Sequence, residues 1–143
     1  MILIDVNVLL YAYDQTDPRH DLAARWVEDV MSGDDEVGLA LVTILAFLRI
    51  STDPRIHEEP REAADAIAVI EGWLAQPNVR VVEPTGRHWS TFADLASTGR
   101  ARGPLLMDAH LATLAIEHGA TLATADRGFR RFPGLRIVDP TAA

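Results

Sequence analysis

The stretch that decides the fold is the apolar run Met1–Ile4 (MILI), which ends at Asp5. A short continuous apolar run is typical of a parallel strand that is covered on both faces. A carboxylate held beside such a strand costs several kcal/mol unless a cation or a set of donors compensates its charge. The run therefore predicts a buried strand with a polar site at its carboxyl end.

Strand and helix signals alternate along the rest of the chain. We expect strands at residues 1–4, 37–42, 79–82, 120–124 and 135–138. We expect helices at residues 7–13, 18–32, 43–50, 60–76, 87–97 and 105–118, with Thr43 as the cap of the third and Pro60 opening the fourth. In that fourth helix we expect inward-facing apolar residues, namely Ala63, Ala64, Ile67, Ile70, Trp73 and Leu74. The alternation predicts an α/β fold with a mostly parallel sheet.

Two further aspartates stand in apolar surroundings, Asp108 within the run 105–109 and Asp126 just after the strand at 120–124. In an open parallel sheet, ligands bind beyond the carboxyl ends of the strands. Asp5 and Asp126 each follow a predicted strand, so we expect them at the same edge. Asp108 shares a helical face with small residues that allow close packing on the sheet, namely Ala112, Ala115 and Gly119. We therefore expect the three carboxylates to converge.

Carboxylate oxygens are the ligands that magnesium and manganese prefer, and a bound divalent ion can activate water against a phosphodiester. The convergence thus predicts metal-assisted phosphodiester hydrolysis. Each acid also has a purely structural interpretation. Asp5 can cap the helix that follows it, Asp126 can begin a turn at Asp126–Gly128, and Asp108 can pair with an arginine. Capping and metal binding by Asp5 are compatible.

Composition limits what surrounds such a pocket. The chain has 143 residues, 48% of them hydrophobic and 24% charged, which predicts one globular domain, residues 1–143. No apolar stretch reaches the roughly 20 residues that cross a bilayer, and the N-terminus lacks a basic signal region, so we expect a cytoplasmic protein without a membrane segment. Cysteine is absent, which excludes disulfides, thiolate zinc sites and thiol nucleophiles.

The net charge of −8 argues against a protein that coats nucleic acid nonspecifically, but a nuclease needs cations only where phosphates lie. All 13 basic residues are arginine. The planar guanidinium group of arginine matches phosphate better than the ammonium group of lysine does, although coding bias also explains this composition. The motifs of serine hydrolases and phosphate-binding loops are absent. His110 and His118 lack a partner at zinc-motif spacing and are interpreted as ordinary helix residues, and His20, His57 and His88 as surface groups.

Three sequence blocks carry a resemblance to a known family. Ile4–Leu10 (IDVNVLL), Leu106–Ala112 (LMDAHLA) and Leu122–Phe129 (LATADRGF) resemble the signature blocks of PIN domains. More narrowly, they are similar to the VapC ribonuclease toxins of type II toxin–antitoxin (VapBC) systems. The resemblance covers essentially the whole chain, including Leu45–Thr52 after the second strand. It implies a PIN-like three-layer α/β/α sandwich around about five mostly parallel strands.

The resemblance also implies an activity and a site. The expected activity is that of a Mg²⁺- or Mn²⁺-dependent endoribonuclease, with Asp5, Asp108 and Asp126 as catalytic and metal-binding residues. The family often has a glutamate where this chain has Ala46, so part of the usual metal shell is missing. Asn7, Thr43 and Thr124 are candidate supporting residues. The candidate contacts to the RNA backbone are Arg49, Arg102 and Arg127, for which surface solubility is the alternative.

The partners implied are an RNA substrate, a cognate VapB-type antitoxin that covers a hydrophobic groove near the early helices, a second copy of the chain, and a higher toxin–antitoxin complex. The absence of the glutamate leaves an alternative open, a catalytically weak or silent PIN-like module that acts by binding its antitoxin or RNA. A receiver-like domain would need a lysine or an Asp-x-Asp-x-Thr nucleophile, and this chain has neither.

Overall fold

The computed structural model describes residues 1–142 and has one five-stranded sheet in the order β3-β2-β1-β4-β5. Its strands are β1 (Ile2–Ile4), β2 (Val37–Ala40), β3 (Val79–Val82), β4 (Thr121–Ala123) and β5 (Arg136–Val138). All four strand pairs are parallel, as the alternating sequence pattern predicted. The first strand thus lies at the centre of the sheet, between β2 and β4, which explains its uninterrupted apolar character.

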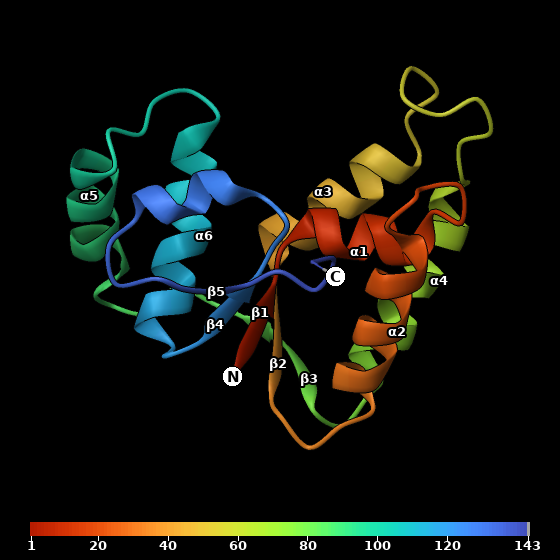
Figure 1. The fold of residues 1–143 in the computed structure, drawn as a ribbon, viewed down its shortest axis with the longest axis horizontal. Coiled ribbons are helices and arrows are strands. Elements are labelled where there is room, and N and C mark those ends of the chain that lie inside the picture. Colours follow the sequence, from red (N-terminus) through yellow and green to blue (C-terminus); the bar gives the residue numbers. More distant parts are fainter. Residues whose placement is uncertain (143) are drawn as a thin grey trace.

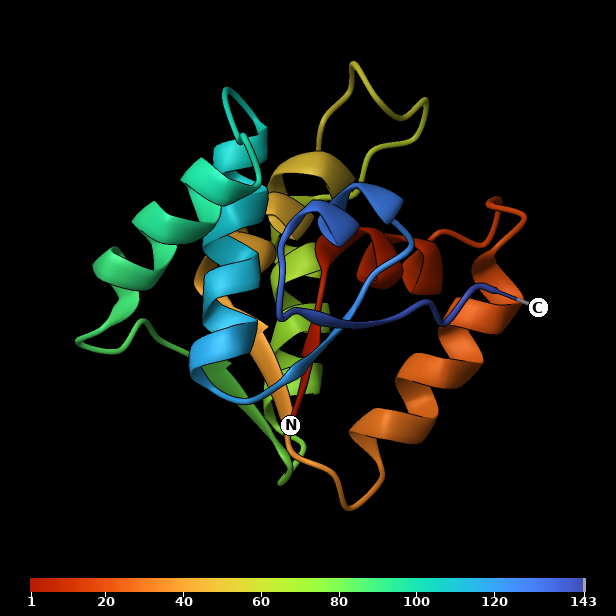
Figure 2. The same ribbon diagram turned by 60° about the vertical axis from the view of Figure 1, so that its left-hand side comes forward.

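Helices cover both faces of the sheet (Figure 1). One side carries α1 (Val6–Tyr13), α2 (His20–Met31), α3 (Leu41–Ser51) and α4 (Ala63–Leu74). The other side carries α5 (His88–Thr98) and α6 (Leu105–Glu117), which Figures 1 and 2 both show side by side, and the short 3-10 helix η1 (Arg127–Arg131). The three-layer α/β/α arrangement that the family resemblance implied is confirmed.

Two hydrophobic clusters lie on opposite faces of the sheet, and neighbouring residues of β1 divide between them. Leu3 packs with α5, α6 and η1, whereas Ile4 packs with α1 to α4. This is the alternation that a pleated strand imposes on successive side chains. Both residues have no exposed surface, so β1 is buried on each face. Among residues 1–142, none of the helices combines the length and the apolar character that crossing a bilayer requires.

Two element boundaries differ from the sequence-based expectations. The second strand ends at Ala40 and not at residue 42, because its pairing with β3 stops at Ala40↔Val82. α3 therefore begins at Leu41, and Thr43 lies inside its first turn instead of capping it; the helix has no side-chain cap. Likewise α4 begins at Ala63 and not at Pro60, because the backbone N–H of Arg61 donates to Ser51 O at 3.0 Å and holds this segment against α3.

The buried face of α4 was only partly predicted. Ala66 and Ile70 are buried, but Ala63, Ala64 and Ile67 are exposed, contrary to the expectation that they face inward. Alanine and other apolar residues occur all around this helix, so hydrophobic periodicity alone could not choose its inward face. Trp73 does pack inward, with its ring 5.2 Å from that of Phe47.

Candidate functional site

Asp5 lies where β1 ends and α1 begins, and it caps that helix. Its Oδ1 accepts a hydrogen bond from the Val6 N–H at 2.7 Å, and its Oδ2 accepts from Asn7 Nδ2 at 3.0 Å and Thr124 Oγ1 at 2.8 Å. Burial raises the pKa of Asp5 above its ordinary value although these hydrogen bonds oppose the rise. The capping interpretation of Asp5 is confirmed. Asp5 is 8% exposed, so it still reaches the protein surface.

Asn7 and Thr124 link Asp5 to the loop after β4. Thr124 Oγ1 accepts from the Asp126 N–H at 3.0 Å and from Asn7 Nδ2 at 3.2 Å. Asn7 Oδ1 accepts from the Ala125 N–H at 3.3 Å. Two chain segments more than a hundred residues apart are thereby joined at the carboxyl edge of the sheet. The structure thus places two of the three candidate supporting residues in contact with Asp5.

Asp108 lies in the first turn of α6 and has no hydrogen-bond partner within residues 1–142. Burial raises its pKa to about 6, and the negative charges of Asp126 and Asp5 contribute to the rise. The charge of Arg131 opposes it. A half-buried carboxylate without donors, beside two other acids, is the arrangement that a cation stabilises most.

Asp126 is exposed and begins η1. Its Oδ1 accepts a hydrogen bond from the Gly128 N–H at 2.8 Å, so the turn-forming interpretation of Asp126 is confirmed. Its charge also acts on both other carboxylates, since it contributes to the raised pKa of Asp5 and of Asp108. The structure therefore brings all three aspartates to the same edge of the sheet.

The chemistry of this donor set fits a hard divalent cation, because it offers carboxylate oxygens that repel one another. Within residues 1–142, however, no three acidic or imidazole side chains stand close enough to hold an ion together as they are placed. Binding would have to draw the carboxylates inward. Asp108 is the side chain best able to move, because no hydrogen bond restrains it.

Comparison with known proteins agrees with the geometry. The PIN-domain family matches residues 2–135. Ribonuclease VapC37 of Mycobacterium tuberculosis is 39% identical over 142 residues, covering 99% of both chains. Ribonuclease VapC43 of the same organism is 40% identical over 141 residues, covering 98% of this chain and 95% of that one. The chain belongs to the PIN-domain family. With relatives this similar over their full length, it is a PIN domain of the VapC group.

Solved structures share the fold. The VapBC-1 structure from nontypeable Haemophilus influenzae has a TM-score of 0.72 at 21% identity, covering 99% of this chain and 100% of that chain. The VapBC2 structure from Rickettsia felis, bound to a promoter DNA fragment, has a TM-score of 0.71 at 15% identity and covers 96% of this chain and 98% of that chain. At such low identity these likenesses concern the PIN fold alone.

The position of the missing PIN-domain glutamate lies on α3. Ala46 is one turn after Thr43, and both follow the carboxyl end of β2. Thr43 is 3% exposed and its hydroxyl has no hydrogen-bond partner within residues 1–142. Asp5 accepts hydrogen bonds from Asn7 and Thr124 but none from Thr43. After β2, the segment therefore has a threonine at residue 43 and an alanine at residue 46, but no carboxylate.

The three arginines expected to contact RNA occupy different places. Arg102 is exposed in the loop before α6, and Arg127 is exposed at the start of η1, next to Asp126. Arg49 lies in the last turn of α3, where its charge contributes to the lowered pKa of Asp53. The charge of Arg49 does not contribute to the raised pKa of Asp5 or of Asp108.

Arg131 is a residue of the site that sequence reasoning missed. Its charge acts on Asp108, and its guanidinium donates to Gly128 O at 3.2 Å and to Gly99 O at 3.3 Å. Only the Asp126–Gly128 turn, which aims η1 back toward α5, brings it there. The sequence signal available was the run of three arginines in residues 127–131.

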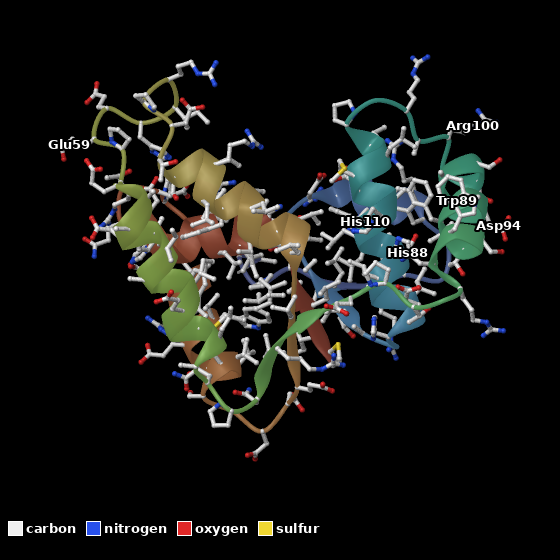
Figure 3. The ribbon with its side chains drawn as sticks, turned by 180° about the vertical axis from the view of Figure 1, so that it is seen from behind. Glu59, His88, Trp89, Asp94, Arg100 and His110 are labelled. Atoms are coloured by element: carbon white, nitrogen blue, oxygen red, sulfur yellow. The ribbon has the colours of Figure 1, made fainter. Side chains whose placement is uncertain are left out.

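A histidine pair between α5 and α6 was also missed. His88 was expected at the surface, but its side chain is 14% exposed; its Nδ1 lies 2.9 Å from Glu117 Oε1 and its Nε2 lies 2.9 Å from His110 Nδ1. Glu117 also accepts hydrogen bonds from the Thr85 N–H and hydroxyl. Together with the bond to His88, they lower the pKa of Glu117 although burial opposes this shift. The surface interpretation of His88 was wrong because two helices meet there. Figure 3 shows His88 and His110 on facing helices.

Proposed function

We propose that this protein is the toxin of a type II toxin–antitoxin pair, an endoribonuclease that depends on Mg²⁺ or Mn²⁺ and acts in the cytoplasm. Relatives that are 36–40% identical over nearly the whole chain are ribonucleases by name. The observation that carries the proposal is that Asp5, Asp108 and Asp126 lie at the carboxyl edge of the sheet, where Asp5 Oδ2 and the Asp126 N–H both bond the Thr124 hydroxyl. The negative charge of Asp126 contributes to the raised pKa values of Asp5 and Asp108, and a bound cation would compensate this repulsion.

The three acids are suited to different roles. Asp5 is held by three donors and is nearly buried, so it fits a fixed ligand. Asp108 has no donor and a pKa raised to about 6, so it is mostly ionised at neutral pH and fits a second ligand. Asp126 is exposed and held through one oxygen only, so its other oxygen can orient the attacking water and accept its proton.

The proposed reaction is hydrolysis of a phosphodiester. A divalent ion held by Asp5 and Asp108 would lower the pKa of water and neutralise charge that develops on the phosphate. The water oxygen forms a bond to phosphorus, the bond to the 3′ oxygen breaks, and that oxygen takes up a proton. The products are a 5′-phosphate and a 3′-hydroxyl. With Ala46 in place of a carboxylate, we expect one ion to bind firmly, a second only weakly, and activity to require millimolar metal.

The test is cleavage of a panel of structured RNAs with Mg²⁺ or Mn²⁺. We expect the wild type to cleave and both Asp5→Asn and Asp108→Asn to lose at least about a hundredfold in rate, because each removes a charged ligand. Asp94→Asn, an exposed acid of α5, is the matched control and should stay active. Equal signals from all four proteins would refute the enzyme and leave the second candidate, a binding module without activity, which Ala46 favours.

The proposed partner is a VapB-type antitoxin that binds beside the early helices. A cavity of about 290 Å³ lies there, and its lining residues come from α1, α2 and α4 or the turns after them: Ala12, Ala24, Val27, Glu28, Met31, Ser32, Trp73 and Gln76. Its mainly apolar lining suits a side chain from a partner's extended segment. Co-expression with the neighbouring short gene should rescue growth arrest, and Ala24→Trp in the toxin should abolish that rescue without reducing RNA cleavage. The family also suggests a homodimer, which sedimentation of the pure chain would test.

A further inference from the structure

Six exposed arginines lie on two segments that contain no acidic residue, 95–107 and 127–138. We call four of them the arginine lip, namely Arg100, Arg102, Arg127 and Arg131. Within residues 1–142 none of the four forms a salt bridge. The lip therefore presents free positive charge on a protein whose net charge is −8.

The two segments of the lip are fixed to each other. Arg131 Nη1 donates to Gly99 O, which lies at the end of α5, and Arg131 Nε donates to Gly128 O within η1. The Phe132 ring packs over Gly99 so closely that a Cβ atom on that glycine would lie 2.8 Å from ring carbons. The end of α5, next to Arg100, and the end of η1, at Arg131, are thus held together.

The lip reaches the acidic pocket at one end. Arg127 directly follows Asp126, and the charge of Arg131 acts on Asp108. At the other end, Arg100 lies just past α5, and Figure 3 shows it at the end of that helix, on the outer side of the molecule. Arg127 and Arg131 thus lie near the carboxylates, and Arg100 lies farther out, at the end of α5.

Arg100 occupies a backbone position that ordinarily belongs to glycine. Its φ is 51°, the only positive value among the non-glycine residues 1–142. It completes a Schellman motif, with the Arg100 N–H bonded to Ser97 O and the Ala101 N–H bonded to Ala96 O. A residue with a Cβ atom is strained there, whereas glycine is not. Such an outlier points to a use for the side chain that glycine would forgo.

We propose that the arginine lip binds consecutive phosphates of a single RNA strand beside the acidic pocket. The inference rests on the proposed function, since it takes RNA as the substrate. An acidic protein repels a polyanion over most of its surface, so the strand needs a basic path to reach the carboxylates. Exposed guanidinium groups that form no salt bridge match phosphate oxygens. Phosphate contacts position a strand without reading its bases.

The test measures binding of a fluorescent 15-nucleotide single-stranded RNA, and of DNA of the same sequence, to full-length protein carrying Asp5→Asn to prevent cleavage. Arg100→Gly and Arg131→Gln are compared with Arg25→Gln, which makes the same charge change on exposed α2. In about 150 mM salt we expect each lip variant to bind about fourfold more weakly, and the slope of log affinity against log salt to fall by about 0.7. Each lip variant should lose as much affinity for RNA as for DNA. Arg25→Gln should change neither the affinity nor the salt slope.

Arg100→Gly separates binding from folding. Its melting temperature should equal or exceed that of the parent, because glycine relieves the positive φ, while its RNA affinity falls. Unchanged affinity and salt slope in both lip variants would overturn the proposal. So would an unchanged RNA affinity combined with weaker binding of the antitoxin, which would make the lip a protein contact. Failure of the parent to bind any RNA would instead overturn the proposed function.

Discussion

The two faces of the sheet differ in how they use charge and bulk. On the face of α1 to α4, the buried core consists of Phe47 and mostly branched aliphatic residues, and two arginines are paired with neighbouring acids, Arg19 with Asp17 and Arg55 with Asp53. On the face of α5 and α6, small residues of α6 lie against the sheet, and the arginines of the lip are unpaired. Most of the 21 acidic residues lie between Asp14 and Glu71, on the first of these faces.

This difference shows why a net charge of −8 is a poor guide to what the protein can bind. The acids and the free cations are separated, so the average hides a surface that can attract a polyanion. The acidic pocket lies where the two faces meet, at the carboxyl edge of the sheet. We propose that one face binds RNA through the lip and that the other binds a protein partner at the cavity beside α1, α2 and α4.

The largest expected effect tests whether the two faces are independent. Phe47 has no exposed surface and lies 5.4 Å from the ring of Tyr13, so Phe47→Ala should cost about 3–5 kcal/mol in free energy of unfolding. Phe129 is 1% exposed and lies beneath the lip. Phe129→Ala should lower the free energy of unfolding by a similar amount. Urea unfolding measures both. At a temperature where both variants are folded, only Phe129→Ala should weaken RNA binding, and equal weakening would show that the faces are coupled.

The next effect concerns the close contact that fixes the lip. Gly99→Ala should cost about 1–3 kcal/mol, because the added methyl group would meet the Phe132 ring at 2.8 Å. Gly86→Ala is the matched control, since no atom lies within 4 Å of a Cβ atom there. Thermal unfolding compares the two. A Gly99→Ala protein as stable as the control would mean that the two segments of the lip are not held together as described.

A smaller loss is expected at the junction of the two faces. Thr124→Val removes the hydroxyl that donates to Asp5 Oδ2, so it should destabilise the protein by about 1–2 kcal/mol and reduce cleavage. Thr113→Val provides the control, because that buried hydroxyl bonds only Ala109 O within α6. Thr113→Val should lower stability by no more than Thr124→Val does, and it should leave cleavage unchanged. If both variants cleave equally well, Thr124 does not support the site.

The smallest expected effect has the opposite sign. The pKa of Asp108 is raised to about 6 in the folded protein from 3.8, so its contribution to stability is full below about pH 4 and is lost as the pH rises through about 6. Without metal, Asp108→Asn should therefore stabilise the protein by about 1 kcal/mol at pH 7.5, a value reduced for solvent screening, and by nothing at pH 4. Urea unfolding at the two pH values measures this. Destabilisation at pH 7.5 would contradict the proposed crowding of acids.

Much of the site was predictable because it follows from strand order. An apolar run that ends in aspartate specifies a buried strand with an acid at its tip, and parallel strands bring such tips to one edge. Asp5 and Asp126 were located by this reasoning, and their capping and turn-forming roles follow from local preferences. Asp108 required only the helical period.

Contacts between elements were not predictable in the same way. Alanines on every side of α4 left its buried face undecided, and the start of α3 depended on where pairing between β2 and β3 stops. His88 and His110 meet only because α5 packs against α6. No local pattern encodes such distances.

The sequence by itself determined the strands, the class of fold and the acids at the strand tips, since these depend on hydrophobic periodicity and on the residue next in line. Only the tertiary structure decided that Arg131 reaches Gly99 and that Arg100 adopts a glycine-like conformation. The contact of Arg131 depends on how the turn at Asp126 directs η1 against the end of α5, and the conformation of Arg100 belongs to the Schellman motif that ends α5. That packing arises from side chains far apart in the chain, so the position of the free charge appears only once the helices have docked on the sheet.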